Sequence, residues 1–335
     1  MNIKSFKHYH NYFASKYCLA KLFSDICKNI RLKTLSIHLN DVYFYGLQNY
    51  LKERYLPVIH QAEEEIKHFS APTSEFDGNI FVCWFQGIEN APELVKQCFY
   101  RLKENANGHK ITLLTDDNVF DIVQLPKHVL EKYQAGIITK THLTDIIRTY
   151  LIYYYGGIWI DATTLTTNPL SDEVFKNTFY SIKKKSSSPY FIPNGRWAAY
   201  FLASHKNCPF GFIIHSVLLE YWKTHEELID YFLIDHIINL CYENSQIVKQ
   251  LVDSVPQNNP DADFFKTRYN NPFDEAEWES VNKNTNIFKL SYKAKIEPTK
   301  NNTYYTILIT PPHHQVTCID NILYAPSKKS FQEAA

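Results

Sequence analysis

Two continuous apolar runs of strand length, joined by a helical pattern, constrain the fold of this chain more than any other feature. The first run covers residues 79–85, the helical pattern begins with Asn90 as its N-cap and ends near Gly108, and the second run covers residues 111–115. A strand that is apolar at every position is typical of a sheet buried on both faces. Strand–helix–strand units of this kind wind right-handed and place their strands parallel. We therefore predict an α/β fold built on a parallel sheet.

A second helical pattern covers residues 145–155, with Thr141 or Thr144 as its predicted N-cap. Its apolar residues share one face, and Asp145 and Arg148 lie one turn apart on another face. A carboxylate and a guanidinium in this arrangement can bind a ribose hydroxyl and a phosphate, because the planar guanidinium donates two bonds at once. A plain intrahelical ion pair is the alternative interpretation.

This helix leads into Gly156-Gly157 and then into a short buried strand over residues 158–160, with Asp161 at its carboxyl end. Ligands of open α/β sheets bind outside the carboxyl ends of the strands. A carboxylate there is a hard oxygen ligand for Mn²⁺ or Mg²⁺, which with Arg148 would neutralise a departing diphosphate. An ordinary helix stop and a turn-forming aspartate are the alternatives.

The rest of the chain is predicted more coarsely. Residues 1–75 form a helical region, with helices over residues 17–30 and 42–59 and with Pro57 kinking or breaking the second. The last residues, 311–335, form a tail. Between residues 171 and 255 the pattern indicates strands at 179–182 and 198–203, and helices at 210–222, 228–242 and 247–255.

Composition and charge exclude several classes of protein. With 35 basic and 35 acidic residues, the net charge is zero, so no field of one sign favours nucleic acid or an anionic membrane. The Lys183-Lys184-Lys185 run is interpreted as a solvated loop, with phosphate or lipid-headgroup binding as the minor alternative. The seven cysteines include no C-x-x-C pair, which indicates reduced thiols in a cytosol. No signal peptide or membrane-spanning stretch is visible, so we expect a cytoplasmic protein.

Residues 79–170 resemble the capsular polysaccharide synthesis glycosyltransferases. That family is related to the glycosyltransferases with a D-x-D motif and to the sugar-transferring domain of the large clostridial toxins. The strongest matching pieces are Thr144-Asp145-Ile146-Ile147-Arg148 and Tyr155-Gly156-Gly157-Ile158-Trp159-Ile160-Asp161-Ala162-Thr163. Further pieces match at residues 81–87, 91–98, 113–118 and 125–126, and weaker ones at 230–233 and 288–293.

The resemblance implies a GT-A catalytic domain over residues 76–310, a Rossmann-like sheet with added helices, on which the N-terminal helical region packs. It implies transfer of a sugar from a nucleotide-diphospho-sugar, namely a UDP-sugar, to a saccharide acceptor in capsular or surface polysaccharide biosynthesis, with retention of anomeric configuration. A lipid-linked acceptor would place the chain, without a transmembrane segment, at the inner face of the membrane.

The resemblance also assigns roles to individual residues. Trp84 would stack on the base, with a core aromatic as the alternative. Asp145 would hold ribose or sugar hydroxyls, Arg148 would contact sugar or phosphate, and Asp161 would serve the donor and ligate Mn²⁺ or Mg²⁺. The predicted donor site is completed by Gln86, Gly87, Gly156, Gly157 and Thr163, and the predicted catalytic set consists of Asp145, Arg148, Asp161 and Asp230.

One position departs from the D-x-D pattern, because Thr163 stands where the related enzymes have the second carboxylate. A metal ion at Asp161 would then bind weakly, use water and phosphate oxygens, or recruit another group. The candidate recruits are Asp116, Asp117, Asp235, His236, His313 and His314. On the acceptor side, the candidates are Asn194-Gly195-Arg196-Trp197 as groove residues, with Asp230 and Asp235 either orienting a hydroxyl or lying on a polar helix surface.

Two other functions remain as alternatives. Thr163 is compatible with a member of the same fold that holds a nucleotide-sugar without turnover. A hydrolase with Asp116 and Asp117 as paired carboxylates is disfavoured, because adjacent side chains at a strand end point apart.

Overall fold

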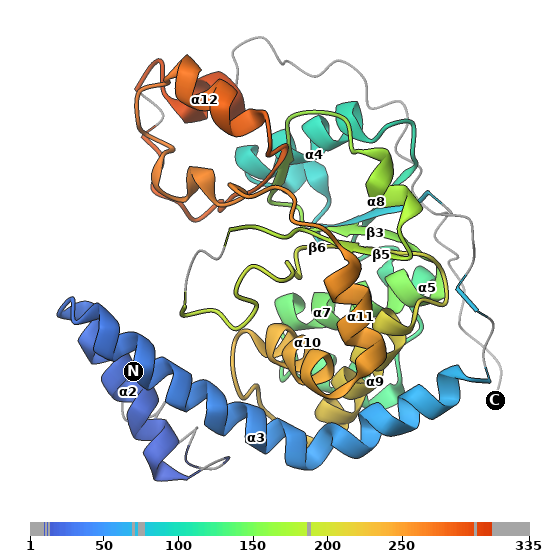
Figure 1. The fold of residues 1–335 in the computed structure, drawn as a ribbon. Helices are drawn as coiled ribbons and strands as arrows, with labels where there is room; N and C mark the ends of the chain where they lie inside the picture. Colours follow the sequence, from blue (N-terminus) through green and yellow to red (C-terminus); the bar gives the residue numbers. More distant parts are fainter. Residues whose placement is uncertain are drawn as a thin grey trace.

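A five-stranded sheet with the strand order β2-β1-β3-β6-β5 forms the centre of the molecule (Figure 1). The computed structural model describes residues 10, 12, 14–68, 71–72, 78–185, 189–297 and 300–309. The strands of this sheet are β1 (Ile80–Cys83), β2 (Ile111–Leu114), β3 (Gly157–Ile160), β5 (Phe179–Ser181) and β6 (Phe201–Ser204). β1 pairs parallel with β2 and β3, whereas β6 pairs antiparallel with β3, and β5 with β6. The predicted parallel strands are therefore present, within a mixed α/β sheet.

The first strand–helix–strand unit runs from β1 through α4 (Glu93–Asn105) to β2. Every residue of β1 is buried, as its continuous apolar sequence predicts for a central strand. The N-cap position of α4 is Pro92. Asn90 instead ends a 3₁₀ turn, η1 (Ile88–Asn90), and its Nδ2 donates to the carbonyl of Gln86, so its prediction as the helix cap is wrong.

The second unit is α7 (Lys140–Tyr154), which leads directly into β3. Its N-cap is Thr139, whose hydroxyl accepts a bond from the backbone N–H of His142. Thr141 and Thr144, the predicted caps, lie inside the helix, which is therefore one turn longer than expected. The extra turn keeps Asp145 and Arg148 away from the fraying end, so their side chains have fixed positions.

Two helices precede the sheet: α2 (Ser15–Asn29) and the long α3 (Lys33–Ile66). α3 continues through Pro57, so a break there is wrong. Pro57 is exposed, whereas Tyr55 and Ile59 on the opposite face are buried in the main core, and this packing holds the helix across the missing hydrogen bond. In Figure 1, α3 runs beside α9 and α10. The division into helical region, catalytic domain and tail stays a prediction, and residues 311–335 lie outside the described part of the chain.

The other helices surround the sheet and complete the core. Their bounds are α5 (Val119–Ile122), α6 (Lys127–Gln134), α8 (Asp172–Lys176), α9 (Pro209–Thr224), α10 (Leu233–Asn244) and α11 (Gln246–Ser254). α10 begins five residues later than the predicted helix at 228–242, because the Asp230 carboxylate accepts the backbone N–H of Phe232 and holds the preceding residues as a turn. No helix among the described residues has both the length and the apolar content needed to cross a bilayer.

A small second sheet pairs β4 (Thr164–Thr166) antiparallel with β7 (Ile287–Lys289). It packs in a separate cluster of aromatic and aliphatic side chains with η2 (Phe264–Thr267), α12 (Glu275–Asn282) and the π-helical turn η3 (Tyr305–Ile309). β4 begins only three residues after Asp161 in the sequence. The second sheet therefore brings the late segment that contains β7 next to the carboxyl end of β3.

Candidate functional site

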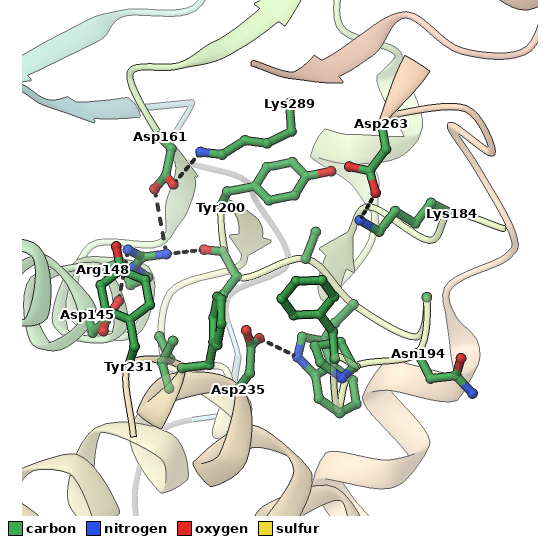
Figure 2. Close-up of a pocket in the computed structure, with 18 of the residues that line it drawn as sticks. Asp145, Arg148, Asp161, Lys184, Asn194, Tyr200, Tyr231, Asp235, Asp263 and Lys289 are labelled. Atoms are coloured by element: carbon green, nitrogen blue, oxygen red, sulfur yellow. Dashed lines mark hydrogen bonds and ion pairs between the residues drawn. The ribbon is translucent and has the colours of Figure 1, made fainter. Parts of the chain in front are cut away.

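A cavity of about 360 Å³ lies outside the carboxyl end of β3. Its walls come from α7, the residue after β3, the segment before β6, the start of α10, η2 with the residue before it, and β7. Charged side chains converge on it from several of these elements (Figure 2). This is where ligands of open α/β sheets bind.

Asp145, Arg148 and Asp161 all line this cavity. Arg148 lies between the two carboxylates. Its Nη2 is 2.9 Å from Asp145 Oδ1, and its Nη1 is 3.6 Å from Asp161 Oδ1. The central requirement of the sequence interpretation, that the polar face of the helix and the following strand end meet in one pocket, is therefore satisfied by the geometry.

Arg148 is held in one position by several acceptors. Its Nε donates to the carbonyl of Thr144 at 3.3 Å, and its Nη1 donates to the carbonyl of Ala199. The guanidinium also lies over the ring of Trp159, 5.2 Å from the centroid. The side chain is almost fully buried. A buried, pre-positioned guanidinium beside an open cavity is suited to an anion such as a phosphate, two oxygens of which can accept from its planar set of N–H donors.

Asp161 is surrounded by donors. Lys289 Nζ lies 2.7 Å from its Oδ2, and the indole N–H of Trp159 donates to its Oδ1 at 2.9 Å. Burial alone would raise the pKa of Asp161, but Lys289, Arg148 and these hydrogen bonds outweigh burial and lower it to about 2. The carboxylate is therefore ionised across the physiological pH range.

Asp145 has the opposite behaviour. Burial raises its pKa to about 7, against the lowering effect of Arg148 and with further raising by Asp161 and Asp235. The two carboxyl groups of the site thus differ in protonation near neutral pH: Asp161 stays charged, and Asp145 holds a proton part of the time.

A second charged group lies on the other side of Tyr200 in Figure 2. Lys184 Nζ is 2.6 Å from Asp263 Oδ2, and Lys266 Nζ is 2.9 Å from the same oxygen. The solvated-loop interpretation of the lysine run is wrong for Lys184, which is mostly buried and lines the cavity, and whose pKa burial lowers. The phenol oxygen of Tyr200, buried in the wall, has no hydrogen-bond partner among the residues that the structure describes.

Most of the predicted acceptor residues line the cavity, but Arg196 does not. Asn194, Gly195, Trp197 and Asp235 line the cavity, and the indole N–H of Trp197 donates to Asp235 Oδ1 at 3.0 Å. Burial raises the pKa of Asp235. Arg196 is directed elsewhere, since its guanidinium donates to the carbonyl of Ile192, to Asn239 and to Glu243.

Asp230, which belonged to the predicted catalytic set, does not line this cavity. It is buried, accepts the hydroxyl of Tyr43 at 2.6 Å and the backbone N–H of Phe232 at 2.8 Å, and lies 3.6 Å from His236 Nε2. Burial alone would raise the pKa of Asp230, but these partners hold it well below its ordinary range. These contacts place Asp230 between α3 and α10, and its membership of the catalytic set stays a prediction.

The two glycines of the predicted donor site also have structural positions. A Cβ on Gly156 would lie 2.6 Å from the backbone nitrogen of Lys206, and a Cβ on Gly157 would lie 2.3 Å from the carbonyl oxygen of Asn79. Both residues have positive φ angles, +71° and +101°. Glycine is required here for the close approach of β3 to its neighbours, and neither residue lines the cavity.

The remaining donor-site candidates lie outside the cavity wall. Trp84 is half-buried against the edge of the Tyr292 ring, with centroids 5.7 Å apart, and its indole N–H has no hydrogen-bond partner in the described part of the chain. Gln86 is exposed, and Gly87 has a φ of +76° with open space where a Cβ would point. The carbonyl of Thr163 accepts the backbone N–H of Leu290, which ties the turn after β3 to the residue after β7.

The donor set around Asp161 does not fit a divalent cation. Both carboxylate oxygens already face cations or N–H donors, and Thr163 supplies no second carboxylate. Over the described ranges, no group of three or more His, Cys, Asp or Glu side chains could hold a metal ion. Of the candidate recruits, Asp116 pairs with Lys140 at 2.6 Å on the surface, Asp117 is exposed, and His236 is buried beside Gln48 and Asp230. Asp235 faces Trp197, and His313 and His314 lie outside the described residues. The metal ion stays a prediction.

Lys289, Tyr200 and Asp263 were missed as site residues from the sequence. The weak match at residues 288–293 was the one signal that could have drawn attention to Lys289. Tyr200 lies in the predicted strand at residues 198–203, whose pattern gives no sign of a site, and Asp263 lies in a segment without a recognisable pattern.

Comparison with known proteins gives three findings. A family model described as "Capsular polysaccharide synthesis protein" matches residues 28–308. "Probable glycosyltransferase FCK3" of Fusarium pseudograminearum (strain CS3096) is 25% identical over 203 residues, which cover 54% of this chain and 48% of that protein. The chain thus spans about half the length of the curated relative it matches. The solved structure "PaToxG Glycosyltransferase" is 14% identical with a TM-score of 0.37, covering 70% of this chain and 94% of that chain, a likeness too low to carry an argument.

Proposed function

The chain belongs to the capsular polysaccharide synthesis protein family, and on that premise we propose that it is a glycosyltransferase that uses a nucleotide-diphospho-sugar donor. The observation that carries the proposal is the convergence of Asp145, Arg148 and Asp161 on one cavity at the carboxyl end of β3. The relative from Fusarium, named a probable glycosyltransferase, points in the same direction.

The charge of the cavity supports an anionic donor. Four cationic side chains and four carboxyl groups line it: Arg148, Lys184, Lys266 and Lys289, and Asp145, Asp161, Asp235 and Asp263. Burial raises the pKa of Asp145 to about 7, so this carboxyl group is protonated part of the time near neutral pH, and burial also raises the pKa of Asp235. The resulting excess of positive charge favours a diphosphate.

We further propose a GT-A arrangement, in which the nucleoside lies at the carboxyl end of β1 beside Trp84 and the diphosphate lies at the end of β3. β1 and β3 are parallel neighbours, so their carboxyl ends open on the same edge of the sheet. The unpartnered indole N–H of Trp84 supports a ligand there. A uridine base and retention of anomeric configuration are parts of the proposal that rest on the family resemblance.

In the proposed reaction, the bond between the anomeric carbon and the diphosphate oxygen breaks, and its electron pair leaves with the diphosphate. The acceptor hydroxyl oxygen bonds to the anomeric carbon, and its proton passes to the departing diphosphate. Arg148 would stabilise the developing negative charge, because its guanidinium is buried in the wall of the cavity and already oriented. Asp161 would hold Arg148 and Lys289 in place.

Aromatic rings at the cavity support a saccharide acceptor. Phe191, Tyr231 and Phe232 line it and are exposed. The rings of Phe191 and Phe232 meet edge to face at a centroid distance of 5.1 Å, and those of Tyr231 and Phe232 at 5.2 Å. Apolar ring faces of this kind can stack on sugar rings. We propose these three residues as the acceptor platform, for a saccharide that can be carried by a lipid at the inner face of the cytoplasmic membrane.

Turnover of a panel of nucleotide-diphospho-sugars, measured as release of nucleoside diphosphate with and without added oligosaccharide, tests the proposal. We expect one donor to be turned over, and Arg148→Ala to reduce its turnover by more than about a hundredfold, the size of effect expected for one charge-stabilising donor. Arg101→Ala is the matched control, because Arg101 pairs with Glu104 on the surface of α4.

Two results would contradict the proposal. Equal turnover by Arg148→Ala and wild type would remove the assigned role of the cavity. Donor binding without product under any condition would favour the non-catalytic nucleotide-sugar-binding protein for which Thr163 is the supporting feature.

A further inference from the structure

We propose that the ammonium group of Lys289 occupies the position and supplies the charge that a divalent cation would otherwise supply at Asp161. This inference rests on the proposed function, because it concerns how the same cavity holds the diphosphate of the donor. It would make the chain a glycosyltransferase whose donor site is complete without a metal ion.

The Asp161 carboxylate is already occupied at both oxygens. Lys289 Nζ lies 2.7 Å from Oδ2, and the indole N–H of Trp159 lies 2.9 Å from Oδ1. Magnesium and calcium ions are held by several oxygen ligands at about 2.0–2.6 Å. An ammonium group at one oxygen and an N–H at the other take up the positions from which such an ion would be bound, and the ammonium would repel it.

The backbone of Lys289 is held firmly by the second sheet. It is the last residue of β7, where it pairs with Thr164 of β4, and its backbone N–H donates to the carbonyl of Ala262. The turn between Asp161 and β4 is closed by a bond from the Thr164 N–H to the Asp161 carbonyl. The same two-stranded sheet therefore fixes both partners, so the ion pair is a built feature of the fold.

The ammonium group of Lys289 faces the cavity. Lys289 lines the cavity, and its Nζ lies over the ring of Tyr200 at 5.0 Å from the centroid (Figure 2). An ammonium has three N–H donors, of which Asp161 takes one. The others are available for diphosphate oxygens, and Arg148 approaches the other oxygen of the same carboxylate.

Lys289 and Arg148 together would therefore offer two positive charges in one wall of the cavity. This equals the charge of one divalent cation. The lysine ammonium is a compact charge whose N–H donors can rotate, and the arginine guanidinium is planar with N–H donors in fixed directions. Together they can stabilise the negative charge that develops on the departing diphosphate.

The test compares metal dependence and diphosphate binding in wild type, Lys289→Met and Lys289→Arg proteins. We expect wild-type donor turnover to stay within about twofold after dialysis against EDTA and after addition of Mn²⁺. Lys289→Met should lose more than about a hundredfold of that turnover, whereas Lys289→Arg, which keeps the charge, should retain part of it. Lys283→Met, an exposed lysine at the end of α12, is the matched control.

A binding readout separates a role at the diphosphate from a structural role. Calorimetric titration should give a Kd for UDP that is raised more than about tenfold by Lys289→Met, and a Kd for uridine that is unchanged, because only UDP contacts the ammonium. Loss of both affinities together would show that the substitution damages the fold, and would contradict the inference.

The outcomes distinguish this inference from the proposed function. Turnover by the wild type that is abolished by EDTA and restored by Mn²⁺ would overturn the inference and leave the glycosyltransferase proposal standing. Absence of binding and turnover for every nucleotide-sugar would overturn both. EDTA-resistant turnover with the expected loss in Lys289→Met supports both.

Discussion

Asp161 and Lys289 are 128 positions apart in the sequence, and their side chains meet at 2.7 Å. The position of Asp161 after a buried strand was predictable, because a continuous apolar run that ends in a carboxylate is a local pattern. Its contact with Lys289 was not, because a three-residue strand has no periodicity by which to place it. A metal site would surround Asp161 with further carboxylates, whereas in the structure its carboxylate lies beside the cations of Lys289 and Arg148.

At the same residue scale, Asp145 should make stability depend on pH. Its folded-state pKa of about 7 is raised from an ordinary 3.8, mainly by burial, so between these values the folded state binds more protons than the unfolded state. The contribution of Asp145 to the free energy of unfolding is largest below about pH 4. It decreases as the pH rises towards 7 and does not change further above that pH. The uncharged Asp145→Asn protein lacks this dependence.

Thermal unfolding of both proteins at several pH values measures the effect. The stability of wild type minus that of Asp145→Asn should fall between pH 5 and pH 7, on the order of 1–3 kcal/mol, and stay constant above about pH 7.5. The other titrating groups are common to both proteins, so the difference measures the titration of Asp145 together with its coupling to Arg148, Asp161 and Asp235. A difference that is constant from pH 5 to pH 9 would show that Asp145 does not titrate in this range.

At the scale of elements, the unit formed by α7 and β3 was predictable with its order and its glycine stop. Its start was misplaced because Thr139, Thr141 and Thr144 are all acceptable N-caps by sequence, and only the bond to His142 selects Thr139. The pairing of β4 with β7 was missed, since two three-residue strands far apart in the sequence give no local signal. The strand pair that positions Lys289 therefore could not be predicted from sequence patterns.

Replacing Gly157 with alanine should destabilise the protein, because β3 approaches Asn79 too closely for a Cβ atom. In Gly157→Ala, the new Cβ would meet the carbonyl oxygen of Asn79 at 2.3 Å, at a φ of +101°. That carbonyl accepts the first hydrogen bond between β3 and the β1 side of the sheet, from Ile158. We expect a loss of more than about 3 kcal/mol in the free energy of unfolding, since strain and steric overlap add.

Gly108→Ala is the control for this substitution, because Gly108 has a φ of +79° but no atom within 4 Å of the place that a Cβ would take. Its loss should be about 1–2 kcal/mol, from backbone conformation alone. Urea unfolding of the two variants gives both values. Equal losses would mean that the close approach of β3 to Asn79 is not what requires glycine.

In the whole molecule, the long helix α3 packs against α2 as well as against α9 and α10. Leu47, Leu51 and Ile59 belong to the same core as the central strands, and Tyr43 donates its hydroxyl to Asp230 just before α10. Sequence periodicity predicted helices in this region but could not show which surface they cover, because an apolar face does not identify its partner.

Tyr43→Phe should therefore reduce stability without changing the donor site. Removing the hydroxyl leaves a buried carboxylate with one bond fewer, at a cost of about 1–3 kcal/mol. Since Asp230 lies outside the cavity wall, the KM for the donor should be unchanged. Tyr45→Phe, on the exposed side of the same helix, should affect neither quantity. Reduced turnover with unchanged stability would instead support a catalytic role for Asp230.

We propose that a donor diphosphate lies in the cavity between Arg148 and Lys289, and a crystal structure of the chain with bound UDP would show its position. We expect diphosphate oxygens within about 3 Å of an Arg148 Nη atom and of Lys289 Nζ, the distance of a charge-assisted hydrogen bond. A diphosphate bound elsewhere, or bound with neither side chain in contact, would contradict it.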